Sequence, residues 1–126
     1  MSTRSNIIIK AKGCKAILYH HYDGYIEGVG QDLVNKLDKF FNSDNYCYWS
    51  DVVNMLVKDK KDDGYEITRG IHGDIDYLYT IDTDEKTIKF QRVNYNVKGN
   101  EWKQTFGRKH DVVTELLKRQ KVKERC

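Results

Sequence analysis

The order of its strand-like and helix-like segments constrains the fold of this chain more than any other sequence feature. Strands are expected where short apolar or β-branched runs occur, and helices where apolar residues recur every three to four positions. These patterns predict strands over 6–10, 16–21, 65–68, 75–81, 87–93 and 101–106, and helices over 29–42, 51–57 and 111–118.

This order lacks the strict alternation of strand and helix that a parallel sheet requires. We therefore expect an α+β fold with an antiparallel sheet of about five strands and three helices packed mainly on one face. The chain has 126 residues, which predicts a single domain over 1–126. Turn residues over 94–100 predict a loop, and the tail from about 120 is expected to fray.

Composition narrows the classes of protein that fit. The net charge of +3 is too small to indicate nucleic-acid binding, so nucleic acid is not the expected partner. Cys14, Cys47 and Cys126 are odd in number and widely spaced, which predicts reduced thiols rather than a disulfide framework or a zinc site. The start MSTRSNIIIK lacks the apolar run of a signal peptide, and no segment approaches the ~20 apolar residues of a membrane span. We expect a cytoplasmic protein with no membrane partner, no metal and no cofactor.

The stretch YHHYDGYIEGVG, residues 19–30, joins a predicted strand to a predicted helix through Gly24, Gly28 and Gly30. Such turns can present backbone N–H groups to an anion. The spacing matches neither the P-loop nor the dinucleotide fingerprint, and nearby carboxylates would repel phosphate. The turn is therefore either a structural entry to the helix or one part of a binding site.

His20 and His21 are adjacent on a predicted strand and should point to opposite faces of the sheet. One imidazole is then expected to be partly buried, with the other free to contact a ligand. Together with Asp23 and Glu27, either histidine could serve a small hydrolase as an acid–base group.

A second stretch, TRGIHGDIDYLY at 68–79, gathers polar side chains around two glycines. A strand with a solvated acidic face explains the alternation of Asp74 and Asp76. Alternatively, Arg69 and His72 recognise a polar ligand at the end of the sheet, because a guanidinium donates two hydrogen bonds to phosphate or carboxylate. Arg4, just before the first strand, could supply another phosphate contact.

Three of these motifs together resemble a family of small, mostly uncharacterised proteins carried by bacteriophages and bacteria. Members share a Thr-Arg-Ser start, an Asp-Gly-Tyr-x-Glu-Gly-x-Gly signature before a helix, and a Gly-Asp-x-x-Tyr-x-Tyr strand. Here these correspond to 3–5, 23–30 and 73–79. The resemblance implies a counter-defence context and implies no catalytic residues.

The favoured hypothesis is a small phage-type binding protein that sequesters a nucleotide-like immune signal of the host without chemistry. It should work as a homo-oligomer, whose neighbouring subunits add walls to a pocket. For this to hold, the segments 22–30 and 69–77 must meet in one hollow. The predicted ligand-binding residues are Arg4, His21, Asp23, Tyr25, Arg69, His72, Tyr77 and Arg92.

Two other functions stay open from the sequence. One is an anti-CRISPR-like inhibitor that binds a host defence nuclease through the basic C-terminal helix or an exposed aromatic patch. The other is a small nucleotide hydrolase built on the histidine pair with Asp23 and Glu27.

Overall fold

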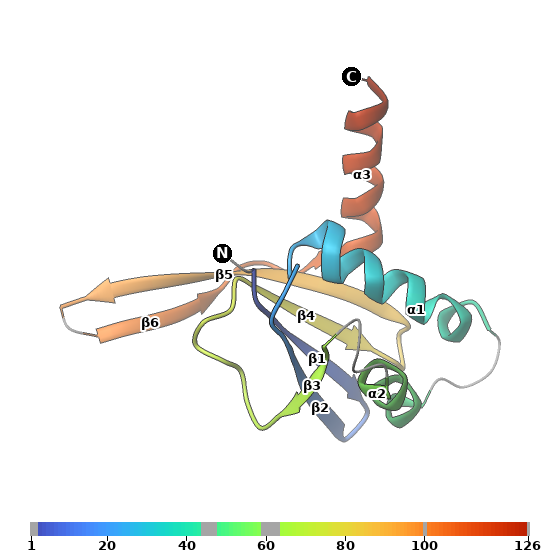
Figure 1. Cartoon of the computed structure of the whole chain (residues 1–126), viewed down its shortest axis with the longest axis horizontal. Coiled ribbons are helices and arrows are strands. Elements are labelled where there is room, and N and C mark those ends of the chain that lie inside the picture. The colour runs from blue at the N-terminus through green and yellow to red at the C-terminus, as the bar shows by residue number, and fades with distance from the viewer. Residues whose placement is uncertain (1–2, 44–47, 59–63, 100, 126) are drawn as a thin grey trace.

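The computed structural model describes residues 3–43, 48–58, 64–99 and 101–125. It has the α+β class and the three helices that the sequence predicts (Figure 1). The elements in chain order are β1 (Ser5–Ala11), β2 (Cys14–His20), the π-helical turn η1 (Ile26–Gly30), α1 (Gln31–Phe41), α2 (Trp49–Lys58), β3 (Glu66–Thr68), β4 (Tyr77–Asp82), β5 (Thr87–Lys98), β6 (Glu101–Phe106), β7 (His110–Asp111) and α3 (Val112–Arg125).

The described strands form one mixed sheet of seven, so the expected antiparallel sheet of about five strands is wrong. The order is β3-β2-β1-β4-β5-β6, with β7 also paired to β5. β1 and β4 run parallel, with Ile7 opposite Tyr79, and the other pairs are antiparallel. Parallel neighbours need a long connection, which here contains β2, both first helices and β3. Apolar periodicity carries no information about strand direction, which is why the sequence missed this pairing.

Several boundaries also differ from the sequence-based expectation, the largest differences lying at 94–100 and in the C-terminal tail. The predicted loop over 94–100 is wrong for its described part, because β5 continues to Lys98 and pairs with β6 after a turn at Gly99. Val93, Tyr95 and Val97 continue the two-residue alternation there. α3 runs to Arg125, through the tail that the sequence predicts to fray. Lysine, arginine, glutamine and glutamate dominate this end and all favour helix.

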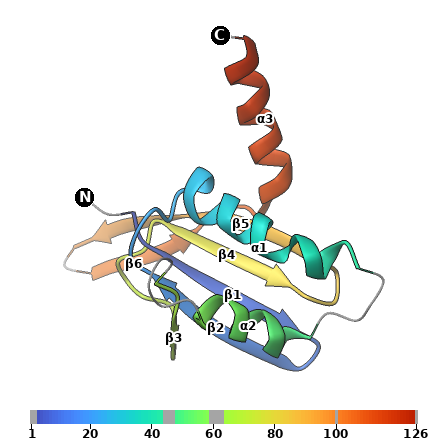
Figure 2. The ribbon, with the colours of Figure 1, turned by 45° about the vertical axis from the view of Figure 1, so that its right-hand side comes forward.

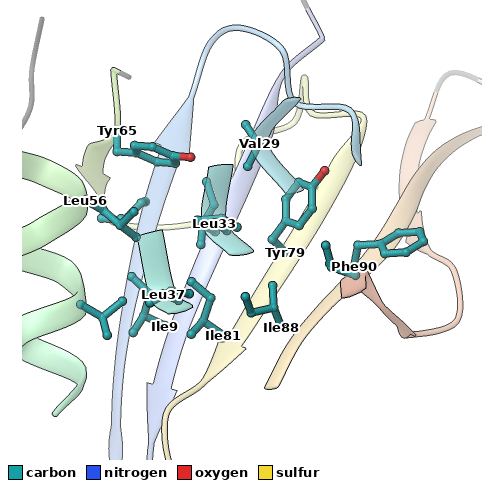
Figure 3. Packing of buried hydrophobic residues seen from close by; sticks show 14 of the residues in the cluster. Ile9, Val29, Leu33, Leu37, Leu56, Tyr65, Tyr79, Ile81, Ile88 and Phe90 are labelled. Atoms are coloured by element: carbon teal, nitrogen blue, oxygen red, sulfur yellow. The ribbon is translucent and has the colours of Figure 1, made fainter. Parts of the chain in front are cut away.

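α1 and α2 cover one face of the sheet and enclose the main core (Figures 1 and 3). Leu33 and Leu37 of α1 and Leu56 of α2 are fully buried against Ile9 and Ile81 of the central strands. α3 starts on the same side but stands away from the sheet beyond its first turns (Figure 2). No helix in the described part of the chain is long and apolar enough to cross a membrane.

A smaller core lies on the opposite face of the sheet. Tyr19, Leu78 and Val93 project there, because neighbouring residues on a strand point to opposite sides. Ile75, in the loop between β3 and β4, is fully buried among them. This loop carries the second glycine-containing stretch, so the smaller core determines where its polar side chains lie.

Candidate functional site

The glycine-rich turn between β2 and α1 is shaped by close packing. A Cβ on Gly28 would lie 2.1 Å from the carbonyl oxygen of Asp23, and one on Gly24 would lie 3.0 Å from that of Thr3. A Cβ on Gly30 would lie 3.2 Å from Cγ1 of Val112 in α3. Neighbouring chain therefore occupies the space where a phosphate cradle would need to be open. The three glycines are therefore explained by the packing of the turn and do not form a phosphate cradle.

The N-terminal segment brings the two glycine-containing stretches together. The Gly24 N–H donates to the Thr3 carbonyl at 2.9 Å, and the Asp76 N–H donates to the Arg4 carbonyl at 2.8 Å. Segments 22–30 and 69–77 therefore flank the same two residues. This is the juxtaposition that the ligand-binding hypothesis requires.

A hollow of about 590 Å³ opens at this junction. Four of the eight predicted ligand-binding residues line it, although they come from four separate parts of the chain: Arg4, Tyr25, Tyr77 and Arg92. Five further residues line the hollow and were not predicted as ligand-binding: Thr3, Asp74, Asp76, Val93 and Asn94. The hollow is thus a mixed surface of two guanidiniums, two carboxylates and two phenol rings.

The charges in the hollow are unevenly paired. Arg4 donates from Nη1 to Asp74 at 3.0 Å, and its backbone N–H donates to Asp76 at 3.3 Å. Arg92 is exposed and makes no ion pair within the described residues. The Tyr25 hydroxyl donates to Asp23 at 3.3 Å, and that carboxylate raises the pKa of the phenol. Arg92 is therefore the cation in the hollow that is available to an anionic ligand.

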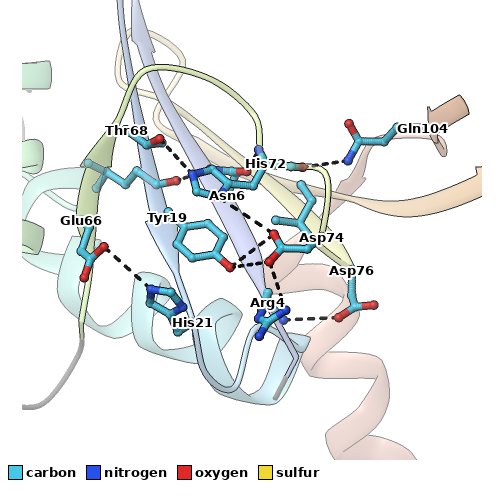
Figure 4. Close-up of polar contacts among 12 residues, drawn as sticks. Arg4, Asn6, Tyr19, His21, Glu66, Thr68, His72, Asp74, Asp76 and Gln104 are labelled. Carbon is cyan, nitrogen blue, oxygen red and sulfur yellow. Dashed lines mark hydrogen bonds and ion pairs between the residues drawn. The ribbon is translucent and has the colours of Figure 1, made fainter. Parts of the chain in front are cut away.

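His72 lies outside the hollow, in a tight polar cluster beside it (Figure 4). The imidazole ring of His72 stacks on Tyr19 with centroids 3.9 Å apart. The backbone N–H of His72 donates to Asn6 Oδ1 at 2.8 Å. Thr68 lies 3.0 Å from Nε2, and Gln104 donates to the His72 carbonyl at 2.9 Å. Both the imidazole and the backbone of His72 are therefore held by the fold, which explains the residue without a ligand.

Tyr19 is the member of this cluster that sequence reasoning missed. Its side chain is buried, and its hydroxyl donates to the two oxygens of Asp74 at 3.1 and 3.3 Å. Burial raises the pKa of the phenol, and the Asp74 carboxylate adds to the effect. Alternation from the core residue Leu18 places Tyr19 on the other face, so the signal was present in the sequence. Tyr19 orients Asp74, which in turn holds Arg4 at the edge of the hollow.

Arg69 and His21 also lie outside the hollow. Arg69 is exposed and makes no ion pair in the part of the chain that the structure describes. His21 is exposed as well, with Nε2 3.8 Å from a Glu66 oxygen and its ring edge-on to Tyr19. Neither residue contributes to the walls of the site.

Asp23 lines a second, smaller cavity of about 180 Å³. His20 shares this cavity and is 7% exposed, as expected for one of two histidines on opposite faces. Its Nδ1 bonds to the Tyr22 carbonyl, and burial lowers the pKa of the imidazole. Tyr65 closes the cavity and donates to Asp32 at 2.8 Å.

The four residues of the hydrolase hypothesis, the two histidines with Asp23 and Glu27, do not meet in this cavity. Glu27 bonds to Arg119 of α3 at 2.5 Å, and His21 faces the opposite side of the sheet. His20 and Asp23 remain as neighbours without the other two groups. Among the described residues, no group of three or more His, Cys, Asp and Glu side chains could hold a metal ion.

Comparisons with protein-family models, curated proteins and solved structures found no significant match. The resemblance to a phage and bacterial family therefore stays a prediction.

Proposed function

We propose that this protein binds and sequesters a nucleotide-like ligand in the hollow beside its N-terminal segment, without chemical change to the ligand. The observation that carries the proposal is the gathering of Arg4, Tyr25, Tyr77 and Arg92 around one space of about 590 Å³. That volume falls within the range of small-molecule sites, roughly 300–1,000 Å³.

Each group lining the hollow suits one part of such a ligand. Arg92 binds an anionic group through the planar fork of its guanidinium. The rings of Tyr25 and Tyr77 offer faces and edges to a base. Asp74 and Asp76 accept hydrogen bonds from ribose hydroxyls or an exocyclic amine. The carboxylates offset the charge of the arginines, so the hollow favours a ligand with few phosphates over a polyphosphate.

The family resemblance supplies the biological context of the proposal. Small accessory proteins of mobile elements often counter host defences, so the ligand is proposed to be a nucleotide immune signal in the cytoplasm of the host. Sequestration needs affinity for the ligand but no chemical reaction. Hydrogen-bonding groups and aromatic rings are sufficient to provide that affinity.

The proposal is tested by thermal-shift measurements with cyclic nucleotides and ADP-ribose derivatives. A bound nucleotide should raise the unfolding temperature by several degrees through mass action. Arg92→Gln should weaken binding by about tenfold or more, because a charge-assisted hydrogen bond is lost. Arg69→Gln is the matched control, since Arg69 is an exposed arginine outside the hollow.

Two results would count against this function. Equal loss of binding in both arginine variants would place the ligand elsewhere. Recovery of a cleaved nucleotide after denaturing the complex would show turnover and favour the hydrolase hypothesis.

A second candidate function is supported by the hairpin that β5 and β6 extend beyond the sheet (Figure 1). Trp102 is 75% exposed there, opposite Val97, which is 54% exposed. Exposed tryptophan is enriched at the centres of protein interfaces. We propose an inhibitor of a host defence nuclease as the alternative. Co-purification with such a nuclease, lost in Trp102→Ser and retained in Arg92→Gln, would favour it.

A further inference from the structure

A further cavity, of about 260 Å³, lies on the face of the sheet opposite the main core. Ile81 of β4 packs into that core, so its neighbour Thr80 projects to the other face, opposite Lys89 of β5. The cavity is lined by Lys10, Thr80, Asp82, Glu85, Thr87, Lys89 and Lys109. None of these residues lines the ligand hollow.

Thr80 is the residue in this cavity that points to a ligand. It is 8% exposed, yet its hydroxyl has no hydrogen-bond partner within the described residues. Among those residues, Ser5 alone has an enclosed side-chain oxygen without a partner, so the Thr80 hydroxyl remains accessible from the cavity. Buried polar groups almost always have a partner, which for Thr80 must come from what enters the cavity.

The three lysines of the cavity are weakly neutralised. Lys89 and Lys109 are exposed and form no ion pair in the part of the chain that the structure describes. The ammonium group of Lys10 lies 3.7 Å from an Asp82 oxygen, which makes a long, partly exposed ion pair worth little. These ammonium groups are therefore available to an anion.

The nearby carboxylates are mostly occupied by the fold. One oxygen of Asp82 accepts two backbone N–H groups of the turn after β4, both at 3.0 Å. Asp111, which lies opposite Lys89 in β7, accepts from the N–H and the hydroxyl of Thr114 at 2.9 Å. Glu85 is exposed and adds one carboxylate to the lining. It repels further negative charge, so the cavity favours an anion with one charged group over a polyanion.

We propose that this cavity binds a single phosphate group, either as inorganic phosphate or on a small phosphate monoester. Lysine ammonium groups are compact donors that bind phosphate oxygens, and a threonine hydroxyl can donate one more hydrogen bond. The volume lies just below the roughly 300–1,000 Å³ of common small-molecule sites, as a ligand of this size requires. The site is separate from the ligand hollow, so it does not depend on the proposed function.

The proposal is tested by NMR titration of the full chain with inorganic phosphate and with glycerol 3-phosphate. The amide signals of Thr80 and Lys89 should shift and saturate in the millimolar range. Thr80→Val keeps the shape of the side chain and should weaken binding by about fivefold or more, because the hydroxyl is lost. Lys89→Gln should weaken it by about two- to fivefold at low salt.

Two variants of matched charge serve as controls, and circular dichroism establishes that all variants are folded. Lys103→Gln removes a lysine of β6 that lies outside the cavity, and Arg92→Gln removes a cation of the ligand hollow. Both should bind phosphate as the wild type does. Tighter binding of glycerol 3-phosphate than of inorganic phosphate would identify a monoester as the ligand, and the reverse would identify the free ion.

Three results would overturn the site. The first is a wild-type chain whose Thr80 and Lys89 signals do not move with either probe. The second is a folded Thr80→Val that binds normally, because the buried hydroxyl would then have no part in binding. The third is equal weakening in Lys103→Gln and Lys89→Gln, which would show general attraction to a basic surface.

Discussion

At the scale of single residues, Gly28 decides the path of the chain between β2 and α1. The carbonyl of Asp23 accepts a hydrogen bond from the Val29 N–H at 2.7 Å, which folds the chain back over the Gly28 position. Asp23 itself has a positive φ of 49°. Gly24, Gly28 and Gly30 are thus explained by a turn that leaves little or no room for a Cβ at their positions.

We expect Gly28→Ala to lower the free energy of unfolding by about 3 kcal/mol or more, because its Cβ would lie 2.1 Å from the Asp23 oxygen and force the backbone to move. Gly73→Ala is the control, since a Cβ there meets nothing within 4 Å. Urea denaturation of both variants measures the difference. Equal stability of the two would show that the turn can relax at little cost.

At the scale of elements, α3 depends on a short ion-pair network for its orientation. Arg119 donates to Glu27 of η1 at 2.5 Å and to Glu115 one turn earlier at 3.1 Å. The side chains are partly exposed, so the contribution to overall stability is small. The network instead links η1, just before α1, to the middle of α3.

Arg119→Gln should therefore cost less than about 1 kcal/mol of global stability, yet speed amide hydrogen exchange along α3. Lys118→Gln, which leaves both carboxylates paired, should exchange at the wild-type rate. Exchange followed by NMR or mass spectrometry separates local opening from global unfolding. Unchanged exchange in Arg119→Gln would mean that packing at Val112 and Leu116 alone orients the helix.

At the scale of the whole molecule, burial of His20 couples stability to pH. Burial lowers the pKa of its imidazole from the ordinary 6.5, although the Tyr22 carbonyl and nearby carboxylates oppose the effect. The unfolded chain takes up this proton near pH 6.5, and the folded protein resists it. The free energy of unfolding contributed by His20 is therefore present above about pH 6.5 and falls as the pH drops below it.

Stability measured between about pH 7.5 and about pH 5.5 should accordingly decline in the wild-type protein. His20→Asn, which keeps a donor for the Tyr22 carbonyl, should show a smaller decline. The exposed His21 provides the control, and His21→Asn should follow the wild type. An undiminished decline in His20→Asn would assign the pH dependence to other groups.

Much of the fold is predictable because it reflects local patterns. The stripe of Leu33 and Leu37 predicts α1, and alternation predicts β4 with Ile81 in the core. The extension of β5 to Lys98 was missed because asparagines there favour turns by themselves. Pairing with β6 outweighs that local preference. Strand direction was missed for a different reason, since no local pattern encodes it.

The sequence predicts the types of residue at the candidate site better than it predicts which individual residues line the hollow. Arg4, Tyr25, Tyr77 and Arg92 were expected and share the hollow, whereas His72 is instead held by Asn6, Thr68 and Gln104. A pattern of polar side chains near glycines does not distinguish a group that faces a ligand from one that the fold already satisfies.

By itself, the sequence determined most of the segments that become helix or strand and which of their faces are buried, because these follow from side-chain spacing over a few residues. Only the tertiary structure decided that β1 lies parallel to β4 and that the three glycines of the turn are packed against neighbouring chain. It alone decided that Arg4 meets Asp74 across 70 positions of sequence. Such contacts depend on how distant segments share one core, and no local pattern records that.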